Sequence, residues 1–243
     1  MRNKEKHQEW SVYSIDSPRR NFIRKGVIIG ALSGFASAGL VVSCREEGEE
    51  EVTPAEDLMR EHGVLNRIML IYDHCRTKLV SGEQFPVETL HDSAQVIRSF
   101  IEDYHEKLEE KYLFPRFVSA NKLVDLVQLL YVQHHAGKVL TDGILQLCNS
   151  NDLKDTGNVQ KMIGLLDSFN RMYRPHEARE DSVLFPALRS IVSRNEYASM
   201  GEDFEKKEHE LFGADGFESM VNKVADLEKQ LGIYDMSAFT PAV

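Results

Sequence analysis

Cysteine is scarce in this chain of 243 residues, and its scarcity excludes a small scaffold held together by disulfides. Three cysteines, Cys44, Cys75 and Cys148, are too few for a disulfide framework, and no two of them form a Cys-x-x-Cys pair. Proline (7) and glycine (15) are also modest in number, so the bulk of the chain is not low-complexity. With 42% hydrophobic residues, the chain can build one good core or two small ones.

Clusters of positive charge are also lacking beyond the N-terminal region. The chain holds 29 Lys and Arg against 39 Asp and Glu, a net charge of −10. Seven of those basic residues and three of the acidic ones lie in residues 1–44, so the remainder carries a net charge of −14. Nucleic-acid binding needs a concentrated basic surface, and we therefore expect no nucleic-acid partner.

Residues 1–44 are built like an export signal rather than like a fold. Arg19 and Arg20 precede an uncharged run, residues 26–43, that is rich in Ala, Gly, Val and Ile. A charged region, an apolar region and small residues at the end mark a targeting peptide. The paired arginines resemble the twin-arginine signal of bacteria, a pathway known for exporting folded and often cofactor-loaded proteins. We therefore expect a periplasmic or cell-envelope protein with a cofactor.

Cys44, at the end of this run, has two readings. Val41-Val42-Ser43-Cys44 resembles a lipobox, in which the Cys becomes the lipidated first residue of the mature chain; alternatively, Cys44 is an ordinary residue after an apolar run. A permanent transmembrane anchor is disfavoured, because the run of about 18 residues is Gly-rich and at the short end of the roughly 17–25 needed to span. Membrane contact is thus expected only through a lipid on Cys44, and residues 45–53 read as an acidic linker.

From residue 54 onward the apolar residues recur with helical spacing. Thr53-Pro54 is typical of a helix start, and the segment 81–86 breaks the first helix. A second helix is expected to end near Pro115, a third runs over about 123–148, and a fourth follows the loop 150–158, with Pro175 kinking it. No run alternates with period two, so the fold class is all-α.

Four long helices with short loops favour an up-down-up-down bundle over residues 54–192. Two shorter helices, at about 195–212 and 216–231, are expected within a C-terminal extension, residues 193–243, that packs on the bundle.

One string occurs twice. Residues 105–115 read HEKLEEKYLFP and residues 176–186 read HEAREDSVLFP, so six of eleven positions match, 71 residues apart. In each copy a His is followed four residues later by a Glu, which places both side chains on one helix face. His62 and His134 lie on the apolar stripes of the first and third helices, 43 and 42 residues before these pairs. The chain therefore contains a duplication in which one His is followed by a His-x-x-x-Glu pair.

Four imidazoles and two carboxylates directed into a bundle predict a dinuclear metal site. A buried Glu is costly unless it is paired or binds a metal, and two Glu side chains can bridge two cations. Iron is favoured by the mixed nitrogen and oxygen donors, with manganese or zinc as alternatives, and six ligands are too many for a single zinc. The predicted ligands are His62, His105, Glu109, His134, His176 and Glu180.

This pattern, with Leu-Phe-Pro after each pair, resembles the hemerythrin-like (HHE cation-binding) family over roughly residues 54–190. The resemblance implies a non-haem di-iron centre in which Glu109 and Glu180 bridge the irons and the four histidines are terminal ligands. The oxygen-carrying hemerythrins use five His, with two on one helix four residues apart, whereas Lys138 stands four residues after His134 here. Ferritin-like proteins, the nearest other fold, use Glu-x-x-His instead.

The missing histidine disfavours simple oxygen carriage and leaves one coordination position open, or filled by water or another residue. Two classes of function then remain. One is a redox enzyme of the oxidase or peroxidase type that reacts with oxygen, peroxide or nitric oxide. The other is a non-catalytic protein that binds, senses or carries oxygen or nitric oxide, or that stores or donates iron.

The other histidines, acidic residues and cysteines are not predicted to bind metal. His134 is preferred to His135 as the ligand because it shares the apolar stripe, and His209 either covers the site or lies on the surface. Cys75 is turned about 140° from His62 and is placed on a flank, so no Cys75–Cys148 bridge is expected. His74 and His91 are expected to be exposed. The neighbours of the ligands are expected on the outer face or as hydrogen-bond partners: Glu106, Glu110, Glu177 and Asp181.

Overall fold

The prediction of an all-helical chain is confirmed by the computed structural model, which describes residues 52–149 and 152–241. No β-strand occurs within those two ranges. The predicted signal, with Cys44, and nearly all of the predicted acidic linker lie outside them. The elements are α2 (Pro54–Ser81), α3 (Val87–Val96), η1 (Ile97–His105), α4 (Glu106–Leu108), η2 (Glu109–Leu113), α5 (Phe114–Ser119), α6 (Val124–Asn149), η3 (Asp152–Lys154), α7 (Thr156–Arg179), η4 (Glu180–Leu184), α8 (Phe185–Leu188), α9 (Arg194–Phe212), α10 (Gly216–Leu231) and η5 (Met236–Phe239).

Local capping chemistry explains where the main helices begin and end. Thr53 and Glu56 form a reciprocal capping box at the start of α2, and Pro54 occupies its first turn. Ser193 caps α9 with its side-chain oxygen, which accepts a hydrogen bond from the backbone N–H of Glu196. Gly82 and Gly232 end α2 and α10 in the left-handed conformation that glycine adopts without steric cost. These caps set the boundaries that the sequence predicted for the first and the last two helices.

The expectation that the second helix ends near Pro115 is wrong. The chain passes from α3 through η1, α4 and η2 into α5 and stays helical to Ser119. Two segments between α3 and α5 are π-helical, Ile97–His105 and Glu109–Leu113. A third π-helical segment, Glu180–Leu184, follows α7. A π turn accommodates proline because its hydrogen bonds run five residues back instead of four. The fourth helix runs through Pro175, as expected, and is α-helical there; it begins at Thr156, inside the segment that was expected to be loop.

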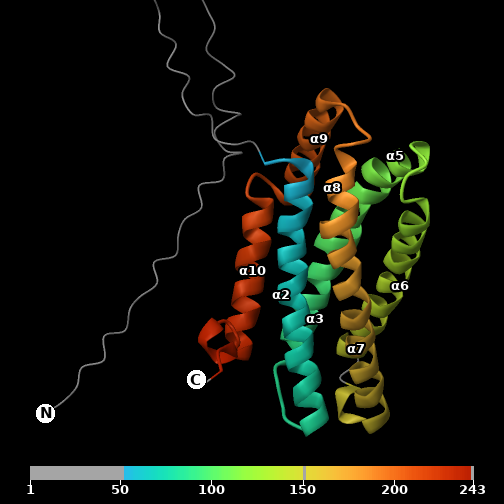
Figure 1. The fold of residues 1–243 in the computed structure, drawn as a ribbon. Coiled ribbons are helices and arrows are strands. Elements are labelled where there is room, and N and C mark those ends of the chain that lie inside the picture. Colours follow the sequence, from blue (N-terminus) through green and yellow to red (C-terminus); the bar gives the residue numbers. More distant parts are fainter. Residues whose placement is uncertain (1–51, 150–151, 242–243) are drawn as a thin grey trace, which may run out of the picture. The chain divides into compact units, whose positions relative to one another are not determined.

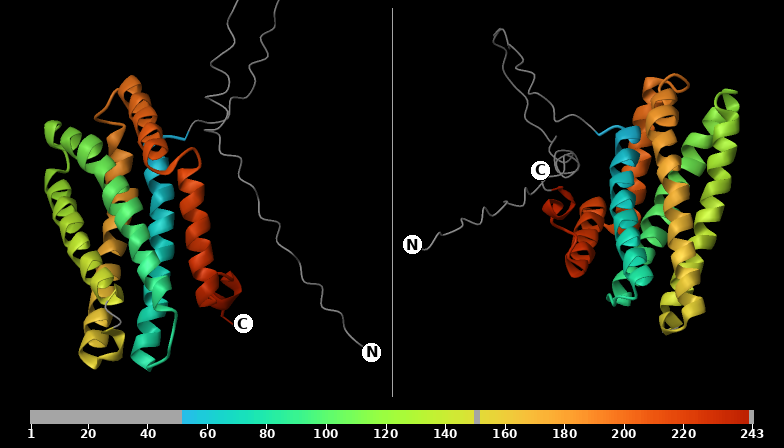
Figure 2. Two further views of the ribbon diagram at one scale, coloured as in Figure 1. Left: turned by 180° about the vertical axis from the view of Figure 1, so that it is seen from behind. Right: turned by 60° about the horizontal axis from the view of Figure 1, so that its bottom comes forward.

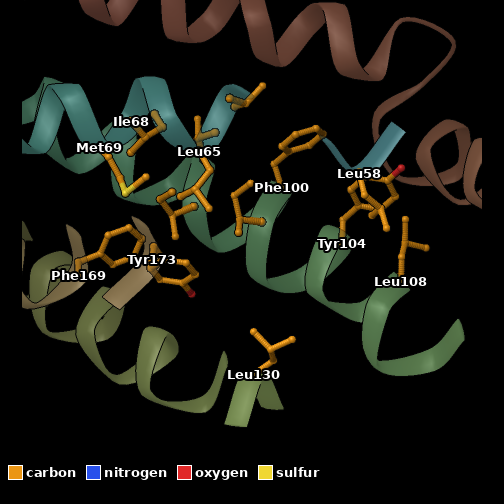
Figure 3. Packing of buried hydrophobic residues seen from close by; sticks show 14 of the residues in the cluster. Leu58, Leu65, Ile68, Met69, Phe100, Tyr104, Leu108, Leu130, Phe169 and Tyr173 are labelled. Atoms are coloured by element: carbon orange, nitrogen blue, oxygen red, sulfur yellow. The ribbon is translucent and has the colours of Figure 1, made fainter. Parts of the chain in front are cut away.

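Helices α2, α3, α6 and α7 lie side by side in the part of the chain beginning at Thr53 (Figures 1 and 2). Helix α2 contacts α7 and η1, and α6 contacts α7, α3 and η1. Their facing stripes form one apolar core, in which Leu58, Leu65, Phe100, Phe169 and Tyr173 are almost completely buried (Figure 3). Such a core gives the polar side chains placed among these residues a surrounding with little water.

The two C-terminal helices share this core. Helix α9 contacts α2, and α10 contacts both α2 and α3. Met200 and Phe204 of α9 are at most 1% exposed, and Val224 of α10 is fully buried. An ion pair between Arg67 of α2 and Glu228 of α10, with Arg67 Nε 3.0 Å from Glu228 Oε1, reinforces the contact. The predicted helices at about 195–212 and 216–231 therefore form and pack on the bundle.

Both cysteines in the described residues are free thiols, and Cys75 is fully buried. Its flank of α2 is covered by other helices, because α2 is in contact with α3, α7, α9 and α10. None of the described helices combines the length and the apolar character needed to cross a membrane.

Candidate metal centre

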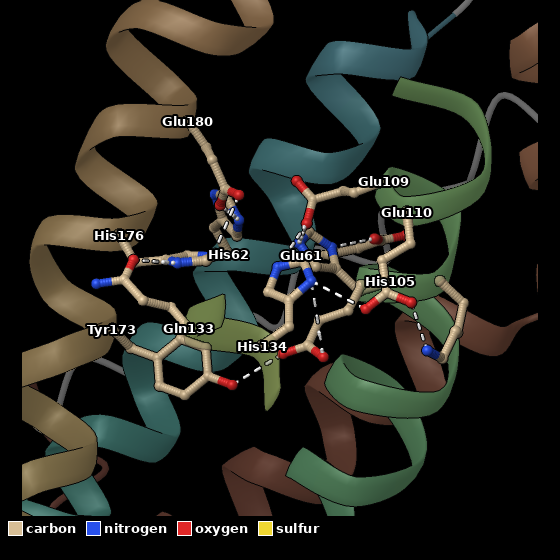
Figure 4. Close-up of polar contacts among 12 residues, drawn as sticks. Glu61, His62, His105, Glu109, Glu110, Gln133, His134, Tyr173, His176 and Glu180 are labelled. Atoms are coloured by element: carbon tan, nitrogen blue, oxygen red, sulfur yellow. Dashed lines mark hydrogen bonds and ion pairs between the residues drawn. The ribbon is translucent and has the colours of Figure 1, made fainter. Parts of the chain in front are cut away.

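The structure brings all six predicted ligand residues together in the middle of the bundle. The two lone histidines come from α2 and α6, and the two His-Glu pairs come from the η1–η2 segment and the α7–η4 segment (Figure 4). No member is more than 4% exposed: His62, His105, Glu109, His134, His176 and Glu180. Six ionisable groups thus meet at a place that water does not reach.

The six residues form two overlapping clusters. Two histidines of the first half, His62 and His105, lie with Glu109 and Glu180, and their ligand atoms are within 4.8 Å of one another. The histidines of the second half form an equivalent cluster with the same two glutamates. Each cluster therefore has two imidazoles of its own, and both clusters share both carboxylates.

Glu180 reaches into both clusters with different oxygen atoms. Its Oε2 lies 3.4 Å from Nε2 of His62, and its Oε1 lies 3.1 Å from Nε2 of His176. A carboxylate whose two oxygens face two separate sets of imidazoles has the orientation of a bridging ligand.

Glu109 approaches both clusters with a single oxygen. Its Oε2 lies 3.4 Å from Nε2 of His134 and 3.8 Å from Nε2 of His105. Neither oxygen of this side chain has a hydrogen-bond partner within the described residues, although both are buried. Burying an ionised carboxylate without hydrogen bonds destabilises the folded protein unless a cation or a proton neutralises its charge.

The outer ring nitrogens of the four histidines are all held by side-chain oxygens of other helices. With Nδ1 protonated, each imidazole donates outward and leaves Nε2 directed at the shared glutamates, the arrangement usual for metal-binding histidines. The pairs are His62 with Asp181 (2.8 Å), His105 with Glu61 (2.8 Å), His134 with Glu110 (3.2 Å) and His176 with Gln133 (3.0 Å).

The repeated Leu-Phe-Pro string supplies an aromatic wall for each lone histidine. Phe114 of the first copy stacks on His134, with ring centroids 5.4 Å apart and an interplanar angle of 25°. Phe185 of the second copy stacks on His62 at 5.5 Å and 20°. The duplication in the sequence is therefore a duplication in space, in which each copy supports a histidine of the other half.

Charge and burial act against each other within the shared carboxylates. Burial, followed by the charge of Glu180, raises the pKa of Glu109 to about 8. Burial also opposes the charged form of Glu180, but His176 and His62 outweigh it and hold the pKa of that carboxyl well below its usual range. Without a cation, one glutamate thus keeps a proton while the other is ionised. A metal ion would replace the proton and satisfy the unpartnered oxygens, so these residues fit a metal centre.

Comparison with known proteins agrees with this geometry. The sequence profile of the Hemerythrin HHE cation binding domain matches residues 53–156 and, in a second match, residues 125–241. The chain belongs to the hemerythrin HHE family. Uncharacterized proteins of Mycobacterium bovis and Mycobacterium tuberculosis are 50% identical to it over 196 residues, which cover 81% of this chain and 77% of each relative. No solved structure matches the chain.

The place where oxygen-carrying hemerythrins have a further histidine is occupied by Lys138, and this side chain takes part in a buried polar network. Its Nζ lies 3.4 Å from Glu106 and 3.8 Å from Glu110. Glu106 also accepts a hydrogen bond of 2.8 Å from the hydroxyl of Tyr173. Tyr173 packs directly over Gly137, where a Cβ atom would lie 2.0 Å from the hydroxyl oxygen. Lys138 is therefore engaged by carboxylates beside the hemerythrin-type site.

The secondary predictions for other polar residues are mostly confirmed. His135 is exposed while His134 is 1% exposed, and His209 lies on the surface of α9. His74 and His91 are half-buried rather than exposed. Glu110 and Asp181 are hydrogen-bond partners of candidate ligand histidines, which was one of the two roles expected for them.

Sequence reasoning missed two of the four residues that hold the histidines. Glu61 and Gln133 stand immediately before His62 and His134 in the chain, yet each holds the histidine of a different helix. The available signal was that a residue with a side-chain oxygen precedes each lone histidine in both halves of the duplication.

Proposed function

We propose that this hemerythrin-family protein holds two iron ions, each bound by two histidines, with Glu109 and Glu180 bridging them. The observation that carries the proposal is that two separate clusters of histidines share the same two buried carboxylates. One cluster would use His62 and His105, and the other would use His134 and His176. A mixed set of imidazole and carboxylate donors suits iron better than a structural zinc ion, for which three or four ligands suffice.

The protein supplies a fixed and nearly dry arrangement of donors. The four Nδ1 contacts hold each imidazole in one orientation, and Phe114 and Phe185 press against two of the rings. When bound, a pair of irons supplies one-electron and two-electron redox chemistry and Lewis acidity toward oxygen, peroxide or nitric oxide. Lys138 is engaged by Glu106 and Glu110, so it would not itself bind the irons, and such a small ligand would take the place of the further histidine.

Two functional classes are compatible with this centre. We favour redox chemistry of the oxidase or peroxidase type. The alternative is non-catalytic binding, sensing or carriage of oxygen or nitric oxide, or storage and donation of iron. Both use the same ligands, and turnover separates them.

We also infer that the four long segments run up-down-up-down and that the chain acts outside the cytoplasm. The topology is supported by the contacts of α2 and α6 with α7 and of α3 with α6, together with the short connections between successive helices. Export is supported by Arg19-Arg20 and the apolar run that follows, with lipidation at Cys44 as one route to the envelope.

The test is metal content combined with an optical spectrum. Protein from iron-supplied cells is reduced without air, analysed for metal, and then exposed to oxygen. About two irons per chain and new near-ultraviolet absorption on oxygenation support the proposal. Absorption that reverses when oxygen is removed favours a carrier, whereas irreversible oxidation with repeated turnover favours an enzyme. One zinc ion or no metal after fair loading contradicts the redox function.

A further inference from the structure

The two halves of the centre are equivalent in layout but not in charge. His105 and His176 occupy matching places in the repeated string, and the Nδ1 of each donates to a side-chain oxygen. For His105 the acceptor is the carboxylate of Glu61, at 2.8 Å, whereas for His176 it is the amide oxygen of Gln133, at 3.0 Å. Glu61 and Gln133 have nearly the same size and shape, so these two acceptors differ from each other essentially by one unit of negative charge.

A second pair of matching positions also makes the second half more positive than the first. Lys138 stands four residues after His134, and the neutral Asn66 stands four residues after His62. Lys138 lies 3.8 Å from Glu110, the carboxylate that holds His134, and Lys107 also pairs with Glu110. Positive charge therefore offsets the acceptor of His134.

The corresponding contact in the first half carries no positive charge. Asn66 donates its hydrogen bond to Glu177, and the acceptor of His62 is the carboxylate of Asp181 at 2.8 Å. Both histidines of the first cluster are thus held by carboxylates. In the second cluster the acceptors are an amide and Glu110, with Glu106 4.0 Å from Nδ1 of His134, and lysines engage both of these carboxylates.

These differences act in one direction on a bound cation. A carboxylate that accepts the Nδ1 proton makes the imidazole a stronger donor at Nε2 than an amide does. A negative charge a few ångströms from a cation also stabilises it, and the effect is largest where water is excluded. Glu61 is fully buried, so its influence on the first cluster is not screened by solvent.

We propose that the two metal positions are unequal: the position at His62 and His105 fills first and holds its ion more tightly, and the position at His134 and His176 is the exchangeable one. Glu61 and Gln133 are then positioning residues that set the order. The inference rests on the proposed dinuclear centre, and it adds which half releases its ion first.

The test is a titration of the metal-free, full-length protein with Fe²⁺ under anaerobic conditions, in competition with a chromogenic ferrous chelator. The wild-type protein should take up two ions in two resolved steps of one ion each, with affinities about tenfold or more apart. This separation is what a single difference among the residues that hold the ligands typically produces, about 10- to 100-fold.

Two reciprocal substitutions identify which step belongs to which half. Glu61→Gln should weaken the first step about 10- to 100-fold and leave the second nearly unchanged. Gln133→Glu should instead tighten the second step and leave the first unchanged. Both variants therefore reduce the difference in Fe²⁺ affinity between the two steps, one by weakening the first step and the other by tightening the second. Glu102→Gln is the matched control, because this fully buried carboxylate pairs with Arg98 rather than with any of the four histidines. It should leave both steps in place.

The outcomes are distinct. Uptake of two ions in a single step, or an effect of Glu61→Gln on the second step, overturns the inequality and leaves the dinuclear centre standing. A wild-type protein that fails to hold two ions overturns both the inequality of the two positions and the dinuclear centre. If Glu61→Gln unfolds, as judged by circular dichroism, Gln133→Glu alone decides, since it must tighten the weaker step.

Discussion

The backbone N–H of Phe114 donates its hydrogen bond to the carbonyl oxygen of Glu109, five residues earlier rather than four. Phe185 and Glu180 repeat the contact in the second half. In both places a proline follows the phenylalanine, and its ring would collide with the carbonyl four residues back in a regular α-helix. The repeated Leu-Phe-Pro thus favours a π turn that starts at each shared glutamate and continues into a helix whose phenylalanine supports a histidine.

Replacing Pro115 by Ala should weaken metal binding without unfolding the helix. An alanine can complete the α-helical hydrogen bond, which removes the reason for the π turn and rotates Glu109 away from His105 and His134. We expect a loss of roughly tenfold or more in Fe²⁺ affinity, comparable to the loss of a residue that orients a ligand. Helix content should stay the same by circular dichroism. Pro86→Ala, at the start of α3, is the control. Unchanged affinity in the Pro115 variant would show that the turn does not aim the glutamate.

The metal-free protein should lose stability as the pH rises from about 5 to 8. Burial raises the pKa of Glu109 to about 8, that of Glu177 to about 8 and that of Glu102 to about 7, from an ordinary value of 4.5. In this window the folded state binds more protons than the unfolded state, so the free energy of unfolding falls as pH increases. Each full proton of difference contributes a slope of about 1.4 kcal/mol per pH unit.

Buried histidines modify this slope above and below neutrality. Burial disfavours protonated His62, but Asp181 and Glu180 outweigh burial and raise its pKa well above the usual value, which steepens the loss of stability above neutrality. Burial disfavours protonated His134, but its hydrogen bonds with Glu109 and Glu110 outweigh burial and raise its pKa to about 10, which acts in the same direction. Burial lowers the pKa of His105, which partly offsets the loss at acidic pH. Thermal unfolding of chelator-treated protein between pH 5 and 8 measures the sum. Glu109→Gln should flatten the curve, and a melting temperature that rises steadily with pH would contradict this account.

Adding a methyl group at Gly137 should destabilise the fold. Its Cβ would lie 2.0 Å from the Tyr173 hydroxyl oxygen and 2.8 Å from the ring carbon that bears it. Because Tyr173 is packed within the core and bonded to Glu106, we expect Gly137→Ala to cost about 1–3 kcal/mol, as overpacking typically does.

Gly164 offers a matched helical position with nothing within 4 Å of a Cβ. Gly164→Ala should stabilise the protein by up to about 1 kcal/mol, because alanine favours the helix. Urea denaturation of both variants measures the difference. Equal effects at the two positions would mean that the Gly137–Tyr173 packing is not tight.

The C-terminal extension should be inseparable from the stability of the bundle. Phe204 of α9 is fully buried and meets Tyr112 with ring centroids 5.4 Å apart. Phe204→Ala should therefore cost about 3–5 kcal/mol. Leu211 lies on the same helix but is 54% exposed, so Leu211→Ala should lower the free energy of unfolding by less than about 0.5 kcal/mol. Two separate unfolding transitions would instead indicate that α9 and α10 form their own unit.

Much of the fold could be predicted from local chemistry. Thr53 and Pro54, and the glycines after α2 and α10, fix helix ends through contacts within a few residues, and the sequence displays them directly. The candidate ligand set was also accessible, because the His-x-x-x-Glu spacing places both groups on one helix face wherever the helix lies. The duplication then related the two halves before any tertiary contact was known.

The remainder depended on tertiary placement. Whether Glu61 holds His105 is decided by the rotation and height of α2 relative to η1, which no spacing along one helix reveals. Pro115 was expected to end its helix because the rule assumes α-helical hydrogen bonds, and the π turn avoids the clash. Cys75 was placed on a flank by an angle measured from His62 alone, whereas α2 is in contact with helices on several sides.

The most direct test of the central claim is a crystal structure of the iron-loaded protein with anomalous diffraction measured at the iron absorption edge. The account predicts two anomalous peaks in the bundle, one beside Nε2 of His62 and His105, the other beside Nε2 of His134 and His176, with Glu109 and Glu180 reaching both. A single peak, or iron held elsewhere, such as among the buried carboxylates Asp57, Glu61 and Glu208, would contradict it.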